Sequence, residues 1–329
     1  MKKRIFSGAQ PTGNLHIGNY LGALKNWVAL QENYESFFCI VNLHAITLPQ
    51  NPEILKRKTL DLARIYLASG INTEKSTIFI QSDVSCHAEL AWVLSCIARM
   101  SEIERMTQFK DKGKGNRERA GVGLFTYPVL MASDILLYQT DLVPIGQDQK
   151  QHLELARDLA ERFNRDFGKA FVIPEPYIPQ VGAKIQSLAE PEKKMSKSDE
   201  NANGSIFLLD DADTILKKFK KAVTDSGTEI KFDESRPAIK NLLTIYQLMT
   251  GKTPAECEAN FAGKGYGQFK TETAEAVIEF LKPFQERVKN YSDEDLKNIL
   301  KTGAEKAKTI ARETLKDVYA KMGIVGADT

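Results

Sequence analysis

Cysteine is scarce in this chain of 329 residues, and the few cysteines lie far apart in the sequence. They form no CxxC pair, so the sequence offers no zinc site, no iron–sulfur cluster and no disulfide framework. The cysteines are Cys39, Cys86, Cys96 and Cys257. Cysteine usage of this kind is typical of a reducing compartment, and we therefore expect a cytoplasmic protein.

Long hydrophobic runs and an excess of charge are also missing. No segment approaches the roughly 20 apolar residues of a membrane-spanning helix, and the N-terminus, MKKRIFSGAQPTG, has no apolar stretch of signal-peptide length. We therefore expect no membrane partner. The formal net charge of +2 gives no overall attraction to nucleic acid, so such a surface must be a local patch. The basic run at 217–221, KKFKK, is a candidate, although it is also typical of a solvated helix face.

Continuous apolar runs alternate with segments of helical spacing in the first half of the chain. Continuous apolar runs at 5–7, 37–41, 77–80 and 143–146 are typical of strands covered on both faces, and segments with helical spacing follow them. This order predicts an α/β fold with a Rossmann-like, doubly wound parallel sheet. After about residue 190 helical segments dominate, which predicts a C-terminal α-helical domain.

The last helical segments carry their own boundary signals. Ser292 and Asp295 form a predicted capping box, which indicates a helix start. Gly303 is expected to end that helix and to separate it from a last helix over 304–321.

The glycine-rich stretch GAQPTGNLHIGNYLG, which also contains a proline, spans residues 8–22 and follows the first predicted strand. Ligands of open parallel sheets bind at the carboxyl ends of strands, and a glycine-rich turn before a helix can approach a phosphate. The spacing of the glycines does not fit G-x-G-x-x-G, so a dinucleotide fingerprint is not supported. On its own, the turn is as compatible with a structural role as with a ligand site.

A second cluster, KKMSKS at 193–198, lies after the predicted sheet and would by itself fit a solvated basic loop. Together, HIGN at 16–19 and KMSKS resemble, in order, separation and context, the HIGH and KMSKS motifs of class I aminoacyl-tRNA synthetases. The final Asn19 and the preceding GAQPTG are similar to the bacterial tryptophanyl branch, in which the first motif usually reads Thr-Ile-Gly-Asn. His16 returns the first position to the class form.

The resemblance runs from about residue 4 to 322. Further matching segments are HAIT (44–47), RMTQFK (105–110), YPVLMASDIL (127–136), GQDQKQH (146–152), GAKI (182–185) and GKGYG (263–267). Two departures are Gln147, where the family usually has glutamate, and Asn42-Leu43, where it usually has Asp-Gln. Neither departure removes an expected catalytic group.

The resemblance implies a two-step reaction. The carboxylate of L-tryptophan attacks the α-phosphate of ATP, which gives tryptophanyl-adenylate and pyrophosphate, and the acyl group then passes to the 3′-terminal ribose of tRNA(Trp). One Mg²⁺ is expected on ATP, held mainly by phosphates and water. The family also implies a homodimer.

The resemblance assigns roles to three parts of the chain. Residues 1–189 are the expected catalytic nucleotide-binding domain, 190–200 the mobile KMSKS loop and linker, and 201–329 the helical anticodon-binding domain. An alternative for the last helix is that it packs back on the first domain.

The match also assigns three groups of site residues. The catalytic group supplies hydrogen-bond donors and positive charge to phosphoryl oxygens, and it comprises His16, Asn19, Lys112, Lys194 and Lys197. The ATP-binding group comprises Gln10, Pro11, Thr12, Gly18, Asn19, Gly146, Gln147, Asp148, Ile185, Lys194, Met195, Ser196, Lys197 and Ser198. The tryptophan-binding group comprises His44, Tyr127, Met131, Asp134 and Gln149. Within the first group, the asparagine can donate at any pH, whereas the charge of a histidine varies near neutrality.

Asp134 is the specificity candidate, because by match it accepts the indole N–H of tryptophan. An alternative is that it caps a helix over the following Ile-Leu-Leu. Met131 fits ordinary core packing equally well. The group of His152, Glu154 and Asp158 has the composition of a metal site, but its place on a predicted helix favours solvated or supporting roles.

Two other functions stay open. A tyrosyl-tRNA synthetase shares the fold and both motif types, and Asn19 and the Met-Ala-Ser-Asp segment disfavour it. A non-catalytic relative that only binds tRNA or tryptophan is disfavoured by the intact lysines of the signature clusters.

Overall fold

The computed structural model describes residues 2–106, 121–146, 149–178, 185–197 and 201–325. The chain forms two compact units. Unit 1 comprises Met1–Thr12, Val28–Gln180 and the segment from Ser292 onward, and unit 2 comprises Gly13–Trp27 and Val181–Tyr291. In the described ranges, no helix combines the length and the apolar character that a membrane crossing requires.

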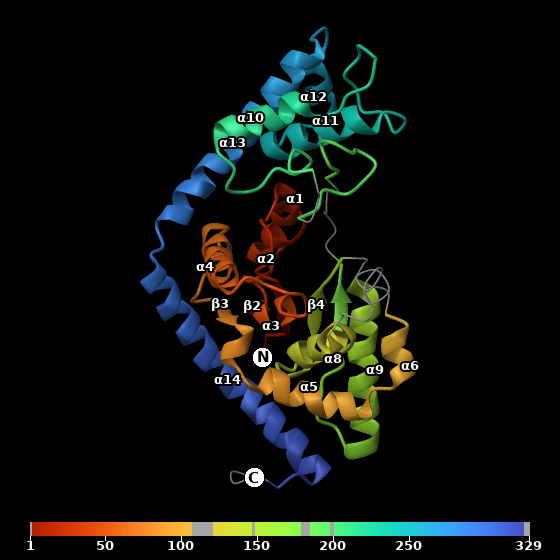
Figure 1. The fold of residues 1–329 in the computed structure, drawn as a ribbon, viewed down its shortest axis with the longest axis vertical. Helices are drawn as coiled ribbons and strands as arrows, with labels where there is room; N and C mark the ends of the chain where they lie inside the picture. The colour runs from red at the N-terminus through yellow and green to blue at the C-terminus, as the bar shows by residue number, and fades with distance from the viewer. Residues whose placement is uncertain (1, 107–120, 147–148, 179–184, 198–200, 326–329) are drawn as a thin grey trace. The chain divides into compact units, whose positions relative to one another are not determined.

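Unit 1 is built on a parallel sheet, which in the described part of the chain has five strands in the order β3-β2-β1-β4-β5 (Figure 1). The strands are β1 (Arg4–Ala9), β2 (Glu35–Ile40), β3 (Ser76–Ile80), β4 (Leu142–Pro144) and β5 (Glu175–Tyr177). The order reverses around β1, which pairs with β2 on one side and with β4 on the other. The predicted Rossmann-like, doubly wound sheet is therefore confirmed.

Helices cover the sheet on both faces, because the strands are apolar on both sides. Phe6, Phe37 and Phe79 belong to a core that they share with helices α5 (Cys86–Ile97), α8 (Val122–Leu136) and α9 (Lys150–Phe167). Tyr66 of α4 donates its hydroxyl hydrogen to the carbonyl oxygen of Cys39 in β2, at 3.4 Å. The helices and helical turns of unit 1 are α3 (Asn42–Ala45), α4 (Pro52–Ala68), the 3₁₀ turn Gln81–Asp83, α5 (Cys86–Ile97), α6 (Met100–Glu104), α8 (Val122–Leu136), α9 (Lys150–Phe167) and α14 (Asp293–Met322).

Unit 2 is helical, as predicted for the region after residue 190. Its core includes Tyr246, Phe261 and Phe269, whose rings meet edge to face with centroids 4.7 and 4.6 Å apart. Its helices are α10 (Ala212–Lys221), α11 (Pro237–Thr250), α12 (Pro254–Phe261) and α13 (Tyr266–Lys289). The predicted helix after the glycine-rich turn consists of α1 (Ile17–Asn19), a π-helical turn (Tyr20–Leu24) and α2 (Lys25–Leu30), of which the last residues belong to unit 1.

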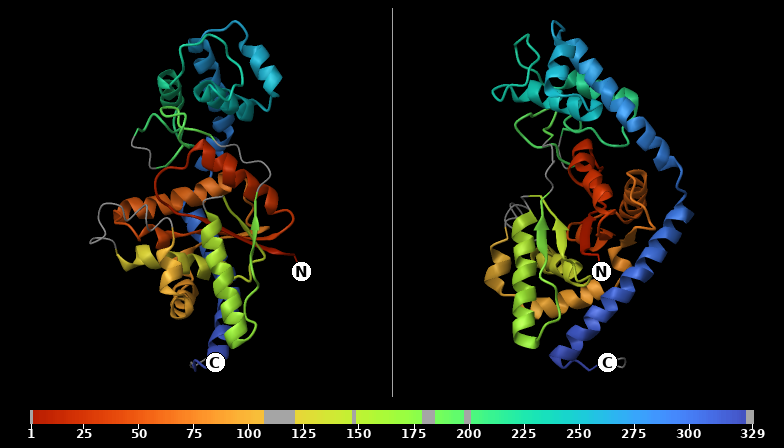
Figure 2. Two further views of the ribbon diagram at one scale, coloured as in Figure 1. Left: turned by 90° about the vertical axis from the view of Figure 1, so that its right-hand side faces the viewer. Right: turned by 180° about the vertical axis from the view of Figure 1, so that it is seen from behind.

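The long helix α14 covers the edge strand β3 and runs without a break through Gly303 (Figure 2). The predicted capping box is present, since Ser292 Oγ accepts from the N–H of Asp295 at 3.1 Å. The expectation that Gly303 separates two helices is wrong. A Cβ at Gly303 would overlap the carbonyl oxygen of Ile78 in β3, so this glycine allows the helix backbone to approach the strand.

We predict that Gly303→Ala destabilises unit 1, although alanine is the better helix former. The methyl group forces α14 away from β3, and overpacking of this kind costs about 1–3 kcal/mol. The measurement is the thermal unfolding midpoint, which should fall by about 4–8 °C for a cost of about 2 kcal/mol. Thr302→Ala, at the exposed neighbouring position, is the matched control and should leave the midpoint within about 2 °C. An equal midpoint for both variants would contradict this role of Gly303.

Candidate functional site

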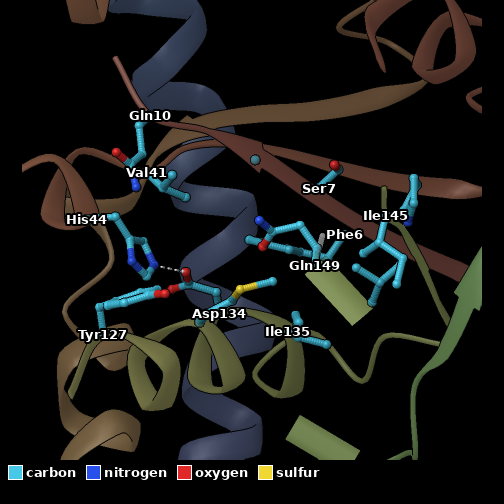
Figure 3. A pocket seen from close by; sticks show the side chains of 14 residues that line it. Phe6, Ser7, Gln10, Val41, His44, Tyr127, Asp134, Ile135, Ile145 and Gln149 are labelled. Carbon is cyan, nitrogen blue, oxygen red and sulfur yellow. Dashed lines mark hydrogen bonds and ion pairs between the residues drawn. The ribbon is translucent and has the colours of Figure 1, made fainter. Parts of the chain in front are cut away.

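A cavity of about 390 Å³ lies in unit 1 where the strand order of the sheet reverses (Figure 3). Phe6, Ser7 and Gly8 of β1 line one part of it, and Val143 and Pro144 of β4 line another. A cavity of this size holds a small molecule, and the reversal point is where open parallel sheets bind ligands. All five residues of the predicted tryptophan-binding group line it, together with Gln10.

The side chain of Asp134 is the centre of the hydrogen bonding beside this cavity. Its Oδ2 lies 2.7 Å from His44 Nε2, a pair that Figure 3 shows directed toward each other. Its Oδ1 accepts from Gln81 Nε2 at 2.7 Å and lies 2.6 Å from His87 Nδ1. Asp134 is only 1% exposed, so these neighbours replace the water that would otherwise solvate its charge.

The balance of these contacts keeps Asp134 ionised. Burial alone would raise the pKa of Asp134, but His44 and His87 more than offset burial and hold this pKa at about 2. An ionised carboxylate only accepts hydrogen bonds, so both histidines donate to it. A carboxylate has about four acceptor positions, and the three bonds leave one for a donor from the cavity.

The positions of Asp134 and Met131 on α8 decide between the alternative roles of these two residues. Asp134 lies in the last turn of α8, so the alternative that it caps a following helix is wrong. Met131 lines the cavity and also packs against the core of unit 1.

Tyr127, which lines the cavity, is hydrogen-bonded to His152. The two side chains are joined by a hydrogen bond of 2.6 Å between the tyrosine hydroxyl and Nε2, and burial raises the pKa of Tyr127. His152 is buried, whereas Glu154 and Asp158 are exposed. Within the described ranges, no group of three or more His, Cys, Asp or Glu side chains could hold a metal ion. His152 contacts the hydroxyl of Tyr127, which lines the cavity.

Sequence reasoning missed Gln81, His87 and Tyr138. Gln81 directly follows β3, and a polar residue at the carboxyl end of a buried strand is a signal that could have found it. His87 lies in the first turn of α5, and Tyr138 follows α8 in an apolar run. Nothing in the sequence near these two residues indicates that they meet.

The signature motifs lie together in unit 2. The HIGN segment is held against residues 206–208, because Ile17 N donates to Ile206 O at 3.0 Å and Leu208 N donates to Leu15 O at 2.8 Å. The KMSKS segment is held by a bond from Met195 N to Ile185 O at 3.0 Å.

Gly13 and Lys197 bring the two motif regions into contact. A Cβ at Gly13 would lie 3.3 Å from Lys197 Cβ, and the positive φ of 65° also favours glycine there. Ser205, which directly precedes residues 206–208, donates its hydroxyl hydrogen to Ser196 O at 2.9 Å. Residues 205–208, which we call the strip, therefore form hydrogen bonds with both motif regions.

Burial controls the charges at these motifs. It lowers the pKa of Lys197 to about 8. Burial, with help from Lys197 and Lys194, lowers the pKa of His16 to about 4. The expectation that the charge of His16 varies near neutrality is therefore wrong, because the ring is neutral at pH 7.

The polar atoms at the motifs suit an anion. His16 Nδ1 is buried and makes no hydrogen bond within the described part of the chain. Asn19 uses its side-chain oxygen to accept from His16 N at 3.1 Å, which leaves its NH₂ group as a donor. With Lys194 and Lys197, this set offers positive charge and donors, as a phosphate group requires.

Lys218 of α10 forms hydrogen bonds with residues at and beside the strip. Its Nζ donates to Ser205 O at 2.8 Å and to Asp210 Oδ2 at 2.6 Å, and that carboxylate also accepts from Phe207 N at 2.8 Å. Lys218 is 6% exposed, so neither a solvated face nor a nucleic-acid patch describes it. The exposed lysines of the run are Lys217, Lys220 and Lys221.

The other residues of the predicted ATP-binding group differ in their exposure. Pro11 is buried, Thr12 is half-buried and Gly146 is exposed beyond β4. Ile185 is buried and lies near Gly18, whose added Cβ would be 3.8 Å from Ile185 Cβ. Lys112, Gln147, Asp148 and Ser198 lie outside the described residues.

The doubly wound sheet, the cavity where its order reverses and the cationic motif pair define a nucleotide-binding α/β protein. Comparisons with known proteins make this more specific. The profile of "tRNA synthetases class I (W and Y)" matches residues 1–282. The chain is 56% identical over 324 residues to the tryptophan–tRNA ligase of Helicobacter pylori, a match that covers 98% of this chain and 99% of that protein.

Solved structures agree. The tryptophanyl-tRNA synthetase of Mycoplasma pneumoniae is similar with a TM-score of 0.89 and 37% identity, over 100% of this chain and 99% of that one. That of Campylobacter jejuni, complexed with ADP and tryptophan, is similar with a TM-score of 0.86 and 37% identity, over 97% and 99% of the two chains. This chain therefore belongs to the family of class I tRNA synthetases for tryptophan and tyrosine, and the resemblance read from its motifs is confirmed.

We predict that Lys218→Met destabilises unit 2 by about 3 kcal/mol, because it leaves the half-buried carboxylate of Asp210 without its counter-ion. Urea unfolding followed by helix circular dichroism measures the loss. Lys217→Met, at the exposed neighbouring position, should change stability by less than about 0.5 kcal/mol. The double variant Lys218→Met/Asp210→Asn should recover part of the loss, and a double variant less stable than Lys218→Met would refute the pairing.

Proposed function

We propose that this chain is a tryptophan–tRNA ligase that activates L-tryptophan with ATP and then transfers the aminoacyl group to tRNA(Trp). One observation carries the proposal: Asp134, an ionised acceptor with one unused position, lines a small-molecule cavity at the reversal point of the sheet. The relatives named for tryptophan, and the similar structure complexed with ADP and tryptophan, support the choice of substrates.

In this proposal the cavity binds the amino acid. Asp134 accepts the indole N–H, and His44 holds the same carboxylate from the side of β2. Phe6, Tyr127 and Met131 supply apolar and aromatic contact area for the indole ring. An amino acid without a matching donor would leave a buried acceptor unsatisfied, which costs about 1–3 kcal/mol.

The motifs act on ATP. In the first step the tryptophan carboxylate forms a bond to the α-phosphorus while the bond to pyrophosphate breaks, and negative charge gathers on the phosphoryl oxygens. Lys194 and Lys197 stabilise this charge, and Asn19 donates a hydrogen bond to it. His16, neutral at pH 7, provides a polar ring nitrogen without adding charge. Lys112, Gln147, Asp148 and Ser198 stay predictions from the family match.

One Mg²⁺ accompanies ATP in the proposal. The described side chains at the motifs are nitrogen donors and cations rather than carboxylates, so they fit phosphate oxygens and not the metal. The ion would therefore be held by the phosphates and water, where it neutralises phosphate charge.

The tRNA completes the proposal. We assign anticodon recognition to the helical region after residue 200, as the family implies, and place the reaction in the cytoplasm, where ribosomes consume the product. The exposed lysines Lys217, Lys220 and Lys221 of α10 are available for contacts with RNA phosphates.

We further propose a homodimer formed through unit 1. Several large apolar side chains of this unit are exposed: Ile46 is 59% exposed, Trp92 73%, Met100 65% and Val122 76%. Exposed aromatic and methionine side chains are typical of protein interfaces.

Amino-acid-dependent exchange of pyrophosphate into ATP tests the function. We expect exchange with tryptophan and at least about 100-fold less with tyrosine, because the single ring of tyrosine is smaller than the indole and carries its O–H donor at a different position from the indole N–H that we assign to Asp134. Exchange with tyrosine alone would mean a tyrosyl enzyme. A folded sample with Mg²⁺ that shows no exchange with any amino acid would mean a non-catalytic relative.

Lys197→Ala tests the role of the second motif. We expect the rate of activation to fall about 10²–10³-fold while the KM for tryptophan changes less than about 3-fold, because the lysine acts on the transition state. In the native protein, kcat/KM for ATP should fall as the pH rises above about 8, where Lys197 loses its proton. Lys197→Arg should remove this decline. Equal losses of rate and tryptophan affinity in the alanine variant would argue against the role.

Trp92→Glu tests the dimer. A charge at this exposed apolar position should raise the dimer dissociation constant by at least about 10-fold in sedimentation velocity, because the charge would be desolvated in the interface. Leu209→Glu, at an exposed leucine of unit 2, is the control and should leave dimerisation unchanged. A native protein that sediments as a monomer at micromolar concentration would rule the dimer out.

A further inference from the structure

Two side chains behind the cavity, His87 and Tyr138, form a hydrogen-bonded chain that ends on Asp134. His87 Nδ1 lies 2.6 Å from Asp134 Oδ1, and His87 Nε2 lies 2.8 Å from the hydroxyl of Tyr138. Both residues are 0% exposed, and neither is among the residues that line the cavity. Neither can therefore touch a bound amino acid directly.

We infer that the Tyr138–His87 pair is a positioning relay, which holds the Asp134 carboxylate as an oriented acceptor and thereby sets the selectivity for a side chain that carries an N–H donor. The inference rests on the proposed function, because it concerns the same amino-acid cavity. It concerns residues that act through Asp134 and not residues that bind the substrate.

The direction of the hydrogen bonds follows from the chemistry of the three groups. The carboxylate only accepts, so Nδ1 of His87 carries a proton. Burial raises the pKa of Tyr138, so its hydroxyl keeps its proton and can donate to Nε2. The tyrosine therefore selects the tautomer of His87 that donates to Asp134, in the way that a second hydrogen bond fixes the tautomer of many functional histidines.

The relay is held rigidly by the core of unit 1. The ring of Tyr138 stacks on Phe6 and Phe37, with centroids 5.5 and 4.9 Å apart. Ser133, the neighbour of Asp134 on α8, donates its hydroxyl hydrogen to the carbonyl oxygen of His87 at 2.7 Å. Helices α5 and α8 are thus joined at this point by a side-chain-to-backbone bond as well as by the bond between His87 and Asp134.

The consequence for selectivity comes from the two carboxylate oxygens. Gln81 and His87 both bond Oδ1, so this oxygen is turned away from ligands. The unused acceptor position then belongs to Oδ2, the oxygen that also contacts His44. Without the relay the carboxylate can rotate, and the acceptor that distinguishes an N–H from an apolar group loses its fixed direction.

The test compares two amino acids that differ only in the donor. They are L-tryptophan and its benzothiophene analogue, in which sulfur replaces the indole N–H. The measured quantity is the ratio of kcat/KM for tryptophan to kcat/KM for the analogue in ATP–pyrophosphate exchange. We expect Tyr138→Phe to lower this ratio about 10-fold and His87→Leu to lower it further, with the KM for ATP unchanged within about 2-fold.

Tyr66→Phe is the matched control. Tyr66 is also 0% exposed and its hydroxyl bonds the carbonyl oxygen of Cys39, so the control removes a buried hydroxyl of the same unit without touching Asp134. Its ratio should equal that of the native protein. Should His87→Leu fail to fold, Tyr138→Phe carries the test alone, because it removes a single oxygen atom.

The outcomes separate the relay from the function. A native protein that prefers tryptophan, with a ratio unchanged in Tyr138→Phe, overturns the relay and leaves the function intact. Equal losses with both amino acids also overturn it, because a merely structural role affects both substrates alike. A native protein without tryptophan-dependent exchange overturns the proposed function and the relay with it.

Discussion

The buried charge of Asp134 is the constraint around which the catalytic unit is arranged. An isolated carboxylate is very costly to bury, so it must be surrounded by donors. His44 follows β2, Gln81 follows β3 and His87 lies at the start of the next helix, and all of them reach one carboxylate on α8. This convergence is possible because the strands are parallel, so that the segments after them emerge at one edge of the sheet.

Unit 2 meets a similar constraint with a buried cation. Lys218 bonds Ser205 O and Asp210, and the strip between these residues carries the backbone bonds to HIGN. The same strip bonds the KMSKS segment through Ser205. In each unit, therefore, one buried charge organises polar groups from distant parts of the chain, while apolar packing supplies most of the stability.

Local signals predicted much of the fold. The apolar runs at 5–7, 37–41 and 77–80 became β1, β2 and β3, because continuous hydrophobic strands are stable only with both faces covered. The prediction failed at Gly303, where a signal that usually ends a helix instead permits close packing on β3. A glycine has the same sequence signature in both roles, and only the neighbouring carbonyl oxygen decides between them.

The order and spacing of HIGN and KMSKS were sufficient to indicate the family, because phosphate chemistry requires glycines, donors and cations in a short stretch of chain. The cavity residues His44, Tyr127, Met131, Asp134 and Gln149 could be assigned by the same match. The partners of Asp134 could not, since Gln81 and His87 are separated from it by 53 and 47 positions and meet it only after the sheet has formed. Charge states also depended on tertiary structure, because burial and neighbouring charges, not residue type, lower the pKa of His16 to about 4.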